Sequence, residues 1–286
     1  MEESVIDTQL IRTSFSQSQV GKHMERKIVG QGRHSTVYEY KDNQVLKMYP
    51  EGTCRQVAET ELNKTRLVKE YGVECPIAHS VVEEAGRFGI LIDHVHGPNY
   101  LEWMLQHPTA LNKLIALFVQ EQHEIHMHKT PELPSIKELL WNKIQGCSEI
   151  PQDSKDILFK KLKKQPEGEH LCHLDFHPEN IVVSLDGPLI IDWADAGKGN
   201  YLADVAMTSV LLEIGTLPIG MSRDEGGLLD YTMGRFFSGY ITEYMKMCGK
   251  GNEELLVWRA PVAAARLAEG IPEERDALWR IIRANL

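Results

Sequence analysis

The feature that most constrains this chain of 286 residues is a set of polar residues around two short apolar runs near its middle. The segment HLDFHPEN places His173, Asp175 and Asn180 in the spacing H-x-D-x-x-x-x-N, and Asp192 follows in the segment IIDW. The pattern over 181–191 predicts a short strand, a turn and a second short strand. An Asp at the end of such a strand is held rigidly, with its carboxylate facing the space beyond the strand.

These residue types are the ones that phosphoryl transfer requires. One carboxylate, here Asp175, orients the attacking hydroxyl and can accept its proton. The amide oxygen of Asn180 and the carboxylate of Asp192 are oxygen ligands suited to Mg²⁺ held against phosphates. Each residue alone would fit an ordinary turn or loop, but their joint spacing favours this chemistry. We therefore predict Asp175 as the catalytic base, and Asn180 and Asp192 as the magnesium ligands.

A glycine-rich turn precedes this segment by more than a hundred residues. Residues 30–35 (GQGRHS) connect two predicted strands. Gly30 and Gly32 would let backbone N–H groups approach phosphate oxygens, and the hydroxyl of Ser35 could donate to one of them. The alternative is a plain hairpin turn. The turn is not a dinucleotide fingerprint, because a strand rather than a helix follows it.

Lys47 lies inside an apolar strand predicted over 44–49, where an amine is costly unless it is paired. Nucleotide phosphates and a helix carboxylate are the partners that a kinase would supply. On the helix predicted over 53–71, Glu61 shares the apolar face, whereas Glu59 shares the polar one. We therefore predict Glu61 as the partner of Lys47. The alternative is an edge-strand lysine whose amine reaches solvent.

The order of the predicted elements indicates two lobes. Strand patterns with one helix occupy the first hundred residues, and helical spacing follows the sequence His-Gly-Pro. We predict an α+β fold with an N-terminal extension (1–23), a small β-rich lobe (24–96) and a larger helical lobe (97–286). The helices expected in the larger lobe cover residues 108–128, 134–147, 153–164, 200–213, 227–248, 252–268 and 273–284.

Composition and charge exclude several other classes of protein. The net charge of −10 argues against non-specific nucleic-acid binding and suits a cationic small molecule better. No apolar run approaches the roughly 20 residues that span a bilayer, and the acidic N-terminus lacks a secretory pattern. We therefore expect a cytoplasmic protein. Without a CxxC pair, the five cysteines indicate neither a disulfide framework nor a zinc site.

The segments GQGRHSTVY, VLKMY, HLDFHPENIVV and IIDWADAGKGNYLADVA resemble the aminoglycoside phosphotransferase and choline kinase family of the protein-kinase-like superfamily. The resemblance covers about residues 24 to 284. It implies a two-lobe protein-kinase-like fold with ATP in the cleft, and GTP as the alternative donor. It also implies that the carbonyl of Asp93 and the N–H of Val95 contact the adenine, and that Asp204 is structural.

The chain departs from the protein kinases of this superfamily in ways that point to small-molecule substrates. Leu174 stands in place of the Arg of H-R-D, and Trp193 stands in place of the Phe of D-F-G. Only eleven residues separate Asp192 from Asp204, and no A-P-E segment occurs. Little room is left for an activation loop, so we predict a constitutive small-molecule kinase.

The acceptor is a small molecule with a hydroxyl group, and the resemblance leaves its identity open. The acceptors of the family include aminoglycosides, choline, ethanolamine, homoserine, methylthioribose, fructosamines and macrolides. An aminoglycoside-like amino sugar is our first expectation, which would make this an antibiotic-resistance enzyme. Segment 215–227 is a candidate acceptor-side loop. The acidic residues that could line a cation site, although most are expected to be solvated, are Asp224, Glu225, Asp230, Glu243, Glu269, Glu273 and Glu274.

Two alternative functions remain at this level. The triad His173-x-Asp175-x-His177 would suit a metal-dependent hydrolase, but this would leave Lys47 and Asn180 unexplained. A nucleotide-binding pseudokinase would act as an interaction module without turnover. The sequence does not define the oligomeric state.

Overall fold

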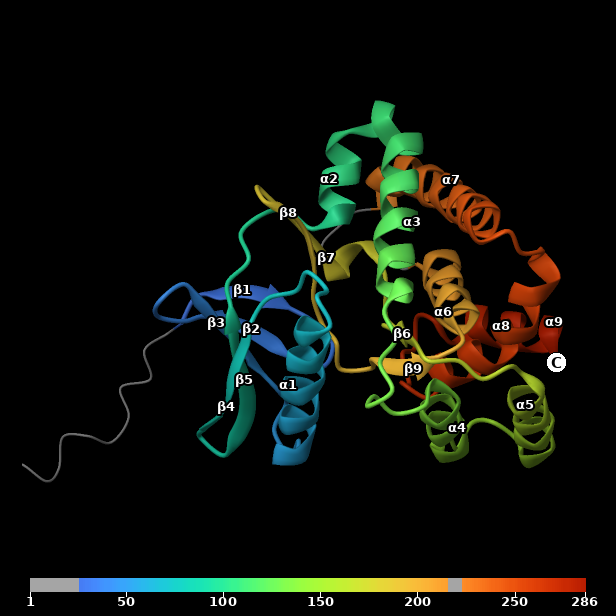
Figure 1. Ribbon diagram of the computed structural model, residues 1–286, viewed down its shortest axis with the longest axis horizontal. Coiled ribbons are helices and arrows are strands. Elements are labelled where there is room, and N and C mark those ends of the chain that lie inside the picture. Colours follow the sequence, from blue (N-terminus) through green and yellow to red (C-terminus); the bar gives the residue numbers. More distant parts are fainter. Residues whose placement is uncertain (1–25, 216–222) are drawn as a thin grey trace, which may run out of the picture.

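The computed structural model describes residues 26–215 and 223–286, with the backbone alone described for 223–231 (Figure 1). The predicted N-terminal extension and nearly all of segment 215–227 therefore lie outside the described side chains.

Five antiparallel strands form the sheet of the N-terminal lobe in the order β1-β2-β3-β5-β4. Helix α1 (Arg55–Glu70) packs against this sheet through the side chains of Ala58 and Leu62, which are buried together with Ala78 and Ile90 of the sheet. Ala58 and Leu62 lie at helical spacing, so the helix presents one apolar face to the sheet. The strands are β1 (Ile28–Gln31), β2 (Thr36–Glu39), β3 (Gln44–Met48), β4 (Ala78–Glu84) and β5 (Arg87–Asp93).

The C-terminal lobe is mostly helical, and its core surrounds α6 (Tyr201–Ile214). Nearly every residue of α6 is buried, because α7 and α8 pack around it. The other helices are α2 (Tyr100–Gln106), α3 (Leu111–Met127), α4 (Ile136–Gly146), α5 (Gln152–Lys164), α7 (Arg223–Cys248), α8 (Asn252–Leu267) and α9 (Arg275–Asn285).

Two small two-stranded sheets flank the loop that contains Asp175. Strand β6 (His170–Cys172) pairs with β9 (Gly197–Gly199), and β7 (Ile181–Ser184) pairs with β8 (Gly187–Ile190), both antiparallel. A short 3₁₀ turn at Pro178–Asn180 leads into β7. Both candidate metal ligands, Asn180 and Asp192, are therefore anchored at ends of the β7–β8 hairpin.

The predicted two-lobe α+β fold is confirmed, although the strands β6 and β9 and the helix α2 were not predicted. Strands β6 and β9 have only three residues each, too few for a periodic pattern. Helix α2 has seven residues, and it begins at a capping box in which Asn99 and Glu102 satisfy each other's backbone N–H groups.

The chain leaves the sheet close to the predicted boundary between the lobes. Strand β5 ends at Asp93, and α2 begins at Tyr100. Gly97 between them has φ of 152°, and a Cβ there would collide with the carbonyl of Val183 in β7. Only glycine allows this close approach of the linker to the C-terminal lobe. We retain residues 96 and 97 as our proposed lobe boundary.

Within the described ranges, no helix is both long enough and apolar enough to cross a membrane.

Candidate active site

Asp175 is positioned by a loop whose backbone is held by a buried carboxylate. The N–H groups of His173 and Leu174 donate to Asp204 at 2.9 and 2.6 Å. Leu174 has φ of 61°, a left-handed conformation that is costly for a branched residue. The bonds to Asp204 stabilise this conformation, and the next side chain, Asp175, keeps 24% of its surface exposed.

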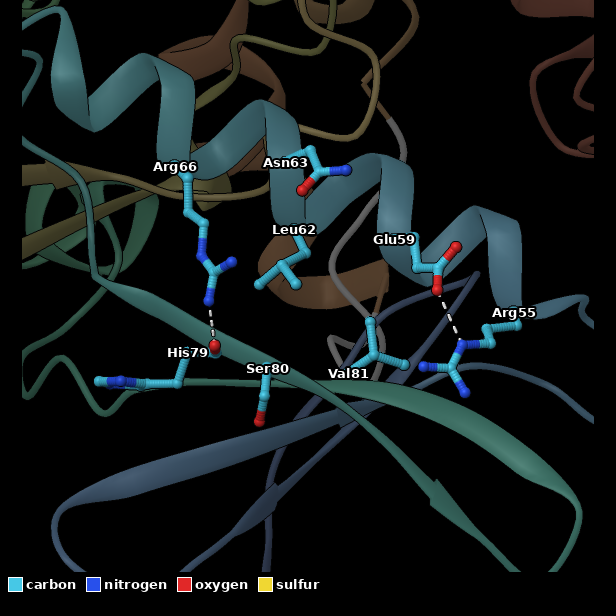
Figure 2. A pocket seen from close by; sticks show the side chains of 8 residues that line it. All are labelled: Arg55, Glu59, Leu62, Asn63, Arg66, His79, Ser80 and Val81. Atoms are coloured by element: carbon cyan, nitrogen blue, oxygen red, sulfur yellow. Dashed lines mark hydrogen bonds and ion pairs between the residues drawn. The ribbon is translucent and has the colours of Figure 1, made fainter.

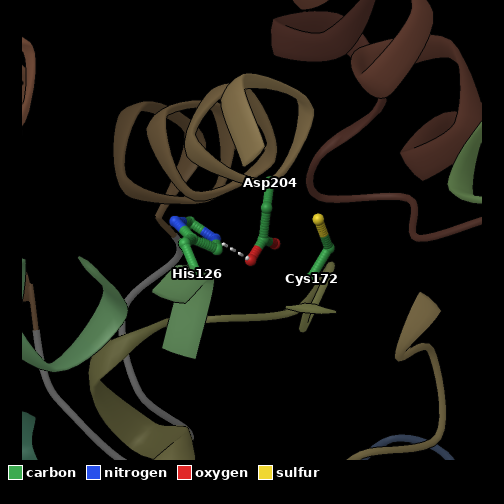
Figure 3. Close-up of side chains that lie close together, drawn as sticks. All are labelled: His126, Cys172 and Asp204. Carbon is green, nitrogen blue, oxygen red and sulfur yellow. Dashed lines mark hydrogen bonds and ion pairs between the residues drawn. The ribbon is translucent and has the colours of Figure 1, made fainter. Parts of the chain in front are cut away.

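Asp204 lies beside His126 and Cys172 in the core (Figure 3). This grouping has the composition of a metal site, but each atom that could bind a metal already forms a hydrogen bond within the protein. The His126 Nε2–H donates to Asp204 at 2.9 Å, and its Nδ1 faces the hydroxyl of Tyr244. Because both carboxylate oxygens of Asp204 already accept N–H groups, the cluster is structural.

Asn180 is fixed against Asp175 in a way that suits a metal ligand. Its Nδ2 group donates to the carbonyl and to the Oδ2 of Asp175, at 2.9 and 3.0 Å. The amide oxygen is thereby the end that can ligate a hard cation. The backbone N–H of Ile191 donates to the carbonyl of Asn180 at 2.9 Å, so Asp192 follows directly beside it.

Lys47, Glu61 and Asp192 meet across the two lobes. The Nζ of Lys47 lies 2.8 Å from Oε1 of Glu61 and 2.9 Å from Oδ1 of Asp192. Tyr49 also donates its hydroxyl to Glu61. Burial lowers the pKa of Lys47, but the two carboxylates outweigh burial and hold this pKa above its usual value. The buried amine is therefore charged and paired on both sides.

The other candidate partner, Glu59, is directed toward Arg55 of the same helix (Figure 2). It pairs with Arg55 at 2.8 Å beside a cavity of about 400 Å³ between α1 and β4. Arg66 closes part of this cavity by donating to backbone carbonyls of β4. None of the predicted site residues lines it, so the cavity is separate from the phosphoryl-transfer site.

We expect Glu61→Gln to weaken MgATP binding about tenfold, because Lys47 would then pair only with the metal-site carboxylate of Asp192. The same substitution at Glu59 should leave the affinity within about twofold, since an exposed pair contributes little. Titration calorimetry of both variants measures this difference. Equal losses of affinity would remove Glu61 from its predicted role.

The segment after Asp192 is tied to two helices, α1 and α4, instead of forming an activation loop. Lys64 of α1 donates to the carbonyl of Ala194 at 2.7 Å, and Lys143 of α4 lies 2.9 Å from Asp195. Lys143 also contacts Glu269, just beyond α8, at 3.1 Å. These contacts fix the segment after Asp192 to α1 and to the helical lobe in one arrangement.

The glycine-rich turn is closed by the N–H of Gly32, which donates to the carbonyl of Ser35 at 3.0 Å. Gly30 lies in β1 opposite Val37. Neither glycine has positive φ, and added Cβ atoms would come no nearer than 3.5 and 3.7 Å to the protein. The fold itself therefore does not require glycine at these two positions. Close approach of a ligand to the backbone would explain why glycine stands there.

At the predicted hinge, two backbone N–H groups are already bonded within the protein. Asp93 donates to the carbonyl of Ile77 at 3.0 Å, and His94 donates to that of Asn43 at 2.8 Å. The carbonyl of Asp93 and the N–H of Val95 remain our proposal for the adenine contacts.

Two cationic side chains beside Asp175 were not predicted as its partners. Nη1 of Arg266 lies 3.6 Å from its Oδ1, and Nε2 of His177 lies 3.6 Å from its Oδ2. Burial raises the pKa of Asp175, but His177 and Arg266 outweigh burial and hold it below its usual range. No spacing in the sequence connects Arg266, 91 residues later, to this loop.

The hydrolase triad does not form. Nδ1 of His173 accepts the N–H of Asp175 at 3.2 Å, and its Nε2 donates to the carbonyl of Ile191 at 3.0 Å. Both ring nitrogens of this fully buried histidine are therefore used by the backbone. His173 shapes the catalytic loop and cannot ligate a metal.

The acidic residues expected near the acceptor have different environments. Glu269 and Glu274 are largely buried and already paired with cations, whereas Glu243 is half-buried beside Lys246 and Glu273 is exposed. Pairing leaves the two buried carboxylates little free charge for a cationic acceptor. The side chains of Asp224, Glu225 and Asp230 lie outside the described residues.

Comparison with known proteins gives one matching family and many matching folds. The model of the phosphotransferase enzyme family matches residues 25–237. A comparison with curated proteins found no match.

Three solved structures illustrate the shared fold. A choline/ethanolamine kinase family protein from Mesorhizobium loti has 15% sequence identity and a TM-score of 0.55, covering 97% of this chain and 94% of that one. A protein provisionally named fructosamine-3-kinase from Haemophilus somnus 129PT has 12% identity and a TM-score of 0.60, with 91% and 90% covered. The GDP and kanamycin complex of APH(2")-IIIa has 18% identity and a TM-score of 0.56, with 98% and 99% covered.

Proposed function

This chain belongs to the phosphotransferase enzyme family, and we propose that it transfers the γ-phosphoryl group of ATP to a hydroxyl of a small molecule. One observation carries the proposal. Lys47 of the N-terminal lobe meets Asp192 of the C-terminal lobe at 2.9 Å, and the hairpin that ends at Asp192 begins at Asn180, which contacts Asp175. An amine suited to phosphates, two oxygen ligands suited to a metal and a carboxylate suited to a general base thus belong to one connected set of contacts.

Each residue has a role that its contacts support. Asp175 accepts the proton of the acceptor hydroxyl as that oxygen attacks the γ-phosphorus, and ADP leaves with the electron pair of the broken P–O bond. Lys47, oriented by Glu61, binds the phosphates together with the turn that contains Gly30, Gly32 and Ser35.

The donor set of Asn180 and Asp192 fits Mg²⁺, because both offer oxygen and lie at adjacent strand ends. When bound, Mg²⁺ would neutralise charge on the phosphates. The carbonyl of Asp93 and the N–H of Val95 would contact the base, with GTP as the alternative donor.

For the acceptor we propose an amino compound with a free hydroxyl, first an aminoglycoside-like amino sugar. The net charge of −10 supports a cation, and a protein of this fold was crystallised with kanamycin. The neighbours named as choline/ethanolamine and fructosamine kinases make choline, ethanolamine and fructosamines the next candidates, followed by homoserine and methylthioribose.

The test is acceptor-dependent ADP formation with MgATP and MgGTP across these classes of compound, followed by ³¹P NMR of the product. We expect one class to stimulate turnover, and Asp175→Asn to abolish this stimulation. Nucleotide binding without turnover on any compound would favour the pseudokinase module. Efficient phosphorylation of a protein serine or threonine would contradict the small-molecule assignment.

We expect Asp192→Ala to remove most of the dependence of ATP binding on Mg²⁺. The affinity ratio with and without the metal should fall at least about tenfold, because the variant lacks one of two proposed ligands. Calorimetric titrations with Mg²⁺ and with EDTA give this ratio. Asp186→Ala, in the exposed turn between β7 and β8, is the control. An unchanged ratio in Asp192→Ala would contradict its role as a ligand.

A further inference from the structure

A chain of ion pairs connects the glycine-rich turn to the catalytic loop through the end of the C-terminal lobe. Nη1 of Arg33, in the turn between β1 and β2, lies 2.6 Å from Oε1 of Glu274. Arg266 donates to the same carboxylate twice, from Nε at 2.7 Å and from Nη2 at 2.9 Å. Its Nη1 donates to Glu269 at 2.7 Å and lies 3.6 Å from Asp175. One carboxylate and one guanidinium thus connect Arg33 to Asp175.

Of the side chains of Arg33, Glu274 and Arg266, two are largely buried, which distinguishes this series of ion pairs from exposed ones. The side chain of Glu274 is 4% exposed and that of Arg266 is 11% exposed, whereas 41% of Arg33 is exposed. A buried carboxylate is stable only when cations pair with it. The two parallel bonds from Arg266 to Glu274 also fix the plane of the guanidinium. Glu274 therefore fixes the guanidinium of Arg266, whose remaining nitrogen lies beside Asp175 and also donates to Glu269.

We propose that Glu274 is a positioning residue that couples the glycine-rich turn to the general base, an inference that rests on the proposed function. Through Arg33 it holds the turn against the C-terminal lobe, where the turn covers the phosphates. Through Arg266 it sets the orientation of Asp175 toward the acceptor. The nucleotide side and the acceptor side of the cleft are thereby aligned by one carboxylate.

Single and double variants separate the two halves of this coupling. Arg33→Met should raise the Kd for MgATP about tenfold and leave kcat within about twofold, because only the turn is released. Glu274→Gln should raise the Kd to the same extent and also lower kcat about tenfold, because both halves lose their partner. The double variant should bind MgATP no more weakly than Glu274→Gln alone, since the two residues act through one contact.

Arg33 could instead bind a phosphate directly, and the cycle distinguishes this. In that case Glu274→Gln would leave the Kd unchanged, or the losses in the double variant would multiply. Either result overturns the coupling. Glu273→Gln is the matched control, because the neighbouring side chain is exposed; it should behave like the wild type.

Amide hydrogen exchange provides a readout that needs neither acceptor nor nucleotide. Residues 30–35 should exchange faster in both Arg33→Met and Glu274→Gln, and residues 173–177 should exchange faster in Glu274→Gln alone. Arg33 is exposed enough that its variant should fold even if Glu274→Gln does not. If the wild type fails to bind MgATP, the proposed function fails, and exchange alone decides the coupling. If residues 30–35 of Arg33→Met exchange at the same rate as in the wild type, the proposed coupling is overturned.

Discussion

Asp175→Asn should lower kcat by at least about 100-fold while MgATP binds with nearly the wild-type affinity. General bases typically contribute 10² to 10⁴ in rate, and the asparagine can orient a hydroxyl but cannot take its proton. Nucleotide affinity should survive because Asp175 is paired with Arg266 and His177 rather than with Lys47. Steady-state kinetics with the stimulating acceptor and calorimetry with MgATP measure the two quantities.

Asp186→Asn is the matched control for this experiment, because it makes the same substitution in an exposed turn of the same lobe. It should retain full turnover. Loss of MgATP binding together with kcat in Asp175→Asn would indicate a collapsed site rather than a missing base. A kcat within about tenfold of the wild type would remove Asp175 from the mechanism.

The residues that sequence reasoning placed correctly relative to one another are those that interact within a short stretch or through one helical face. Asn180 reaches Asp175 within a single turn of the chain, so their spacing already encodes the contact. The choice of Glu61 over Glu59 followed from the periodicity of α1, and the pairing of Glu61 with Lys47 agrees with it. Their functional roles remain proposals that the variants above test.

The contacts that sequence reasoning missed depend on how distant helices pack. Lys64, Lys143 and Arg266 fasten the catalytic and metal-site segments from α1, α4 and α8. Each belongs to a helix whose pattern predicts only which face is apolar. From sequence alone, a charged residue beside that face is predicted to be solvated, because only the tertiary structure shows which residue pairs with it.

The contacts of Asp204 were likewise not predictable from the sequence. The resemblance suggested a structural role, but no pattern showed that the carboxylate would accept three N–H groups from two segments. The catalytic loop can hold Leu174 in a left-handed conformation only because those bonds exist. We therefore expect the position of Asp175 and the stability of the fold to depend on the same buried side chain.

We accordingly expect Asp204→Asn to lower the free energy of unfolding by about 1–3 kcal/mol, the range for leaving a buried hydrogen-bonding group without its partner. The amide presents an NH₂ group where the second carboxylate oxygen accepts N–H groups, so at least one buried donor loses its partner. Urea denaturation measures the loss, with the exposed Asp186→Asn as the control.

The loss should also depend on pH. Burial raises the pKa of Asp204, but the hydrogen bond from His126 outweighs burial and holds this pKa below its usual value. A carboxylate with a depressed folded-state pKa stabilises the protein above the unfolded value of about 3.9, and its contribution is lost as pH falls through the folded value. The difference between the wild type and Asp204→Asn should therefore be full near pH 7 and shrink below pH about 4. A difference that stays constant through this acid range would show that the ionised carboxylate is not what holds the loop.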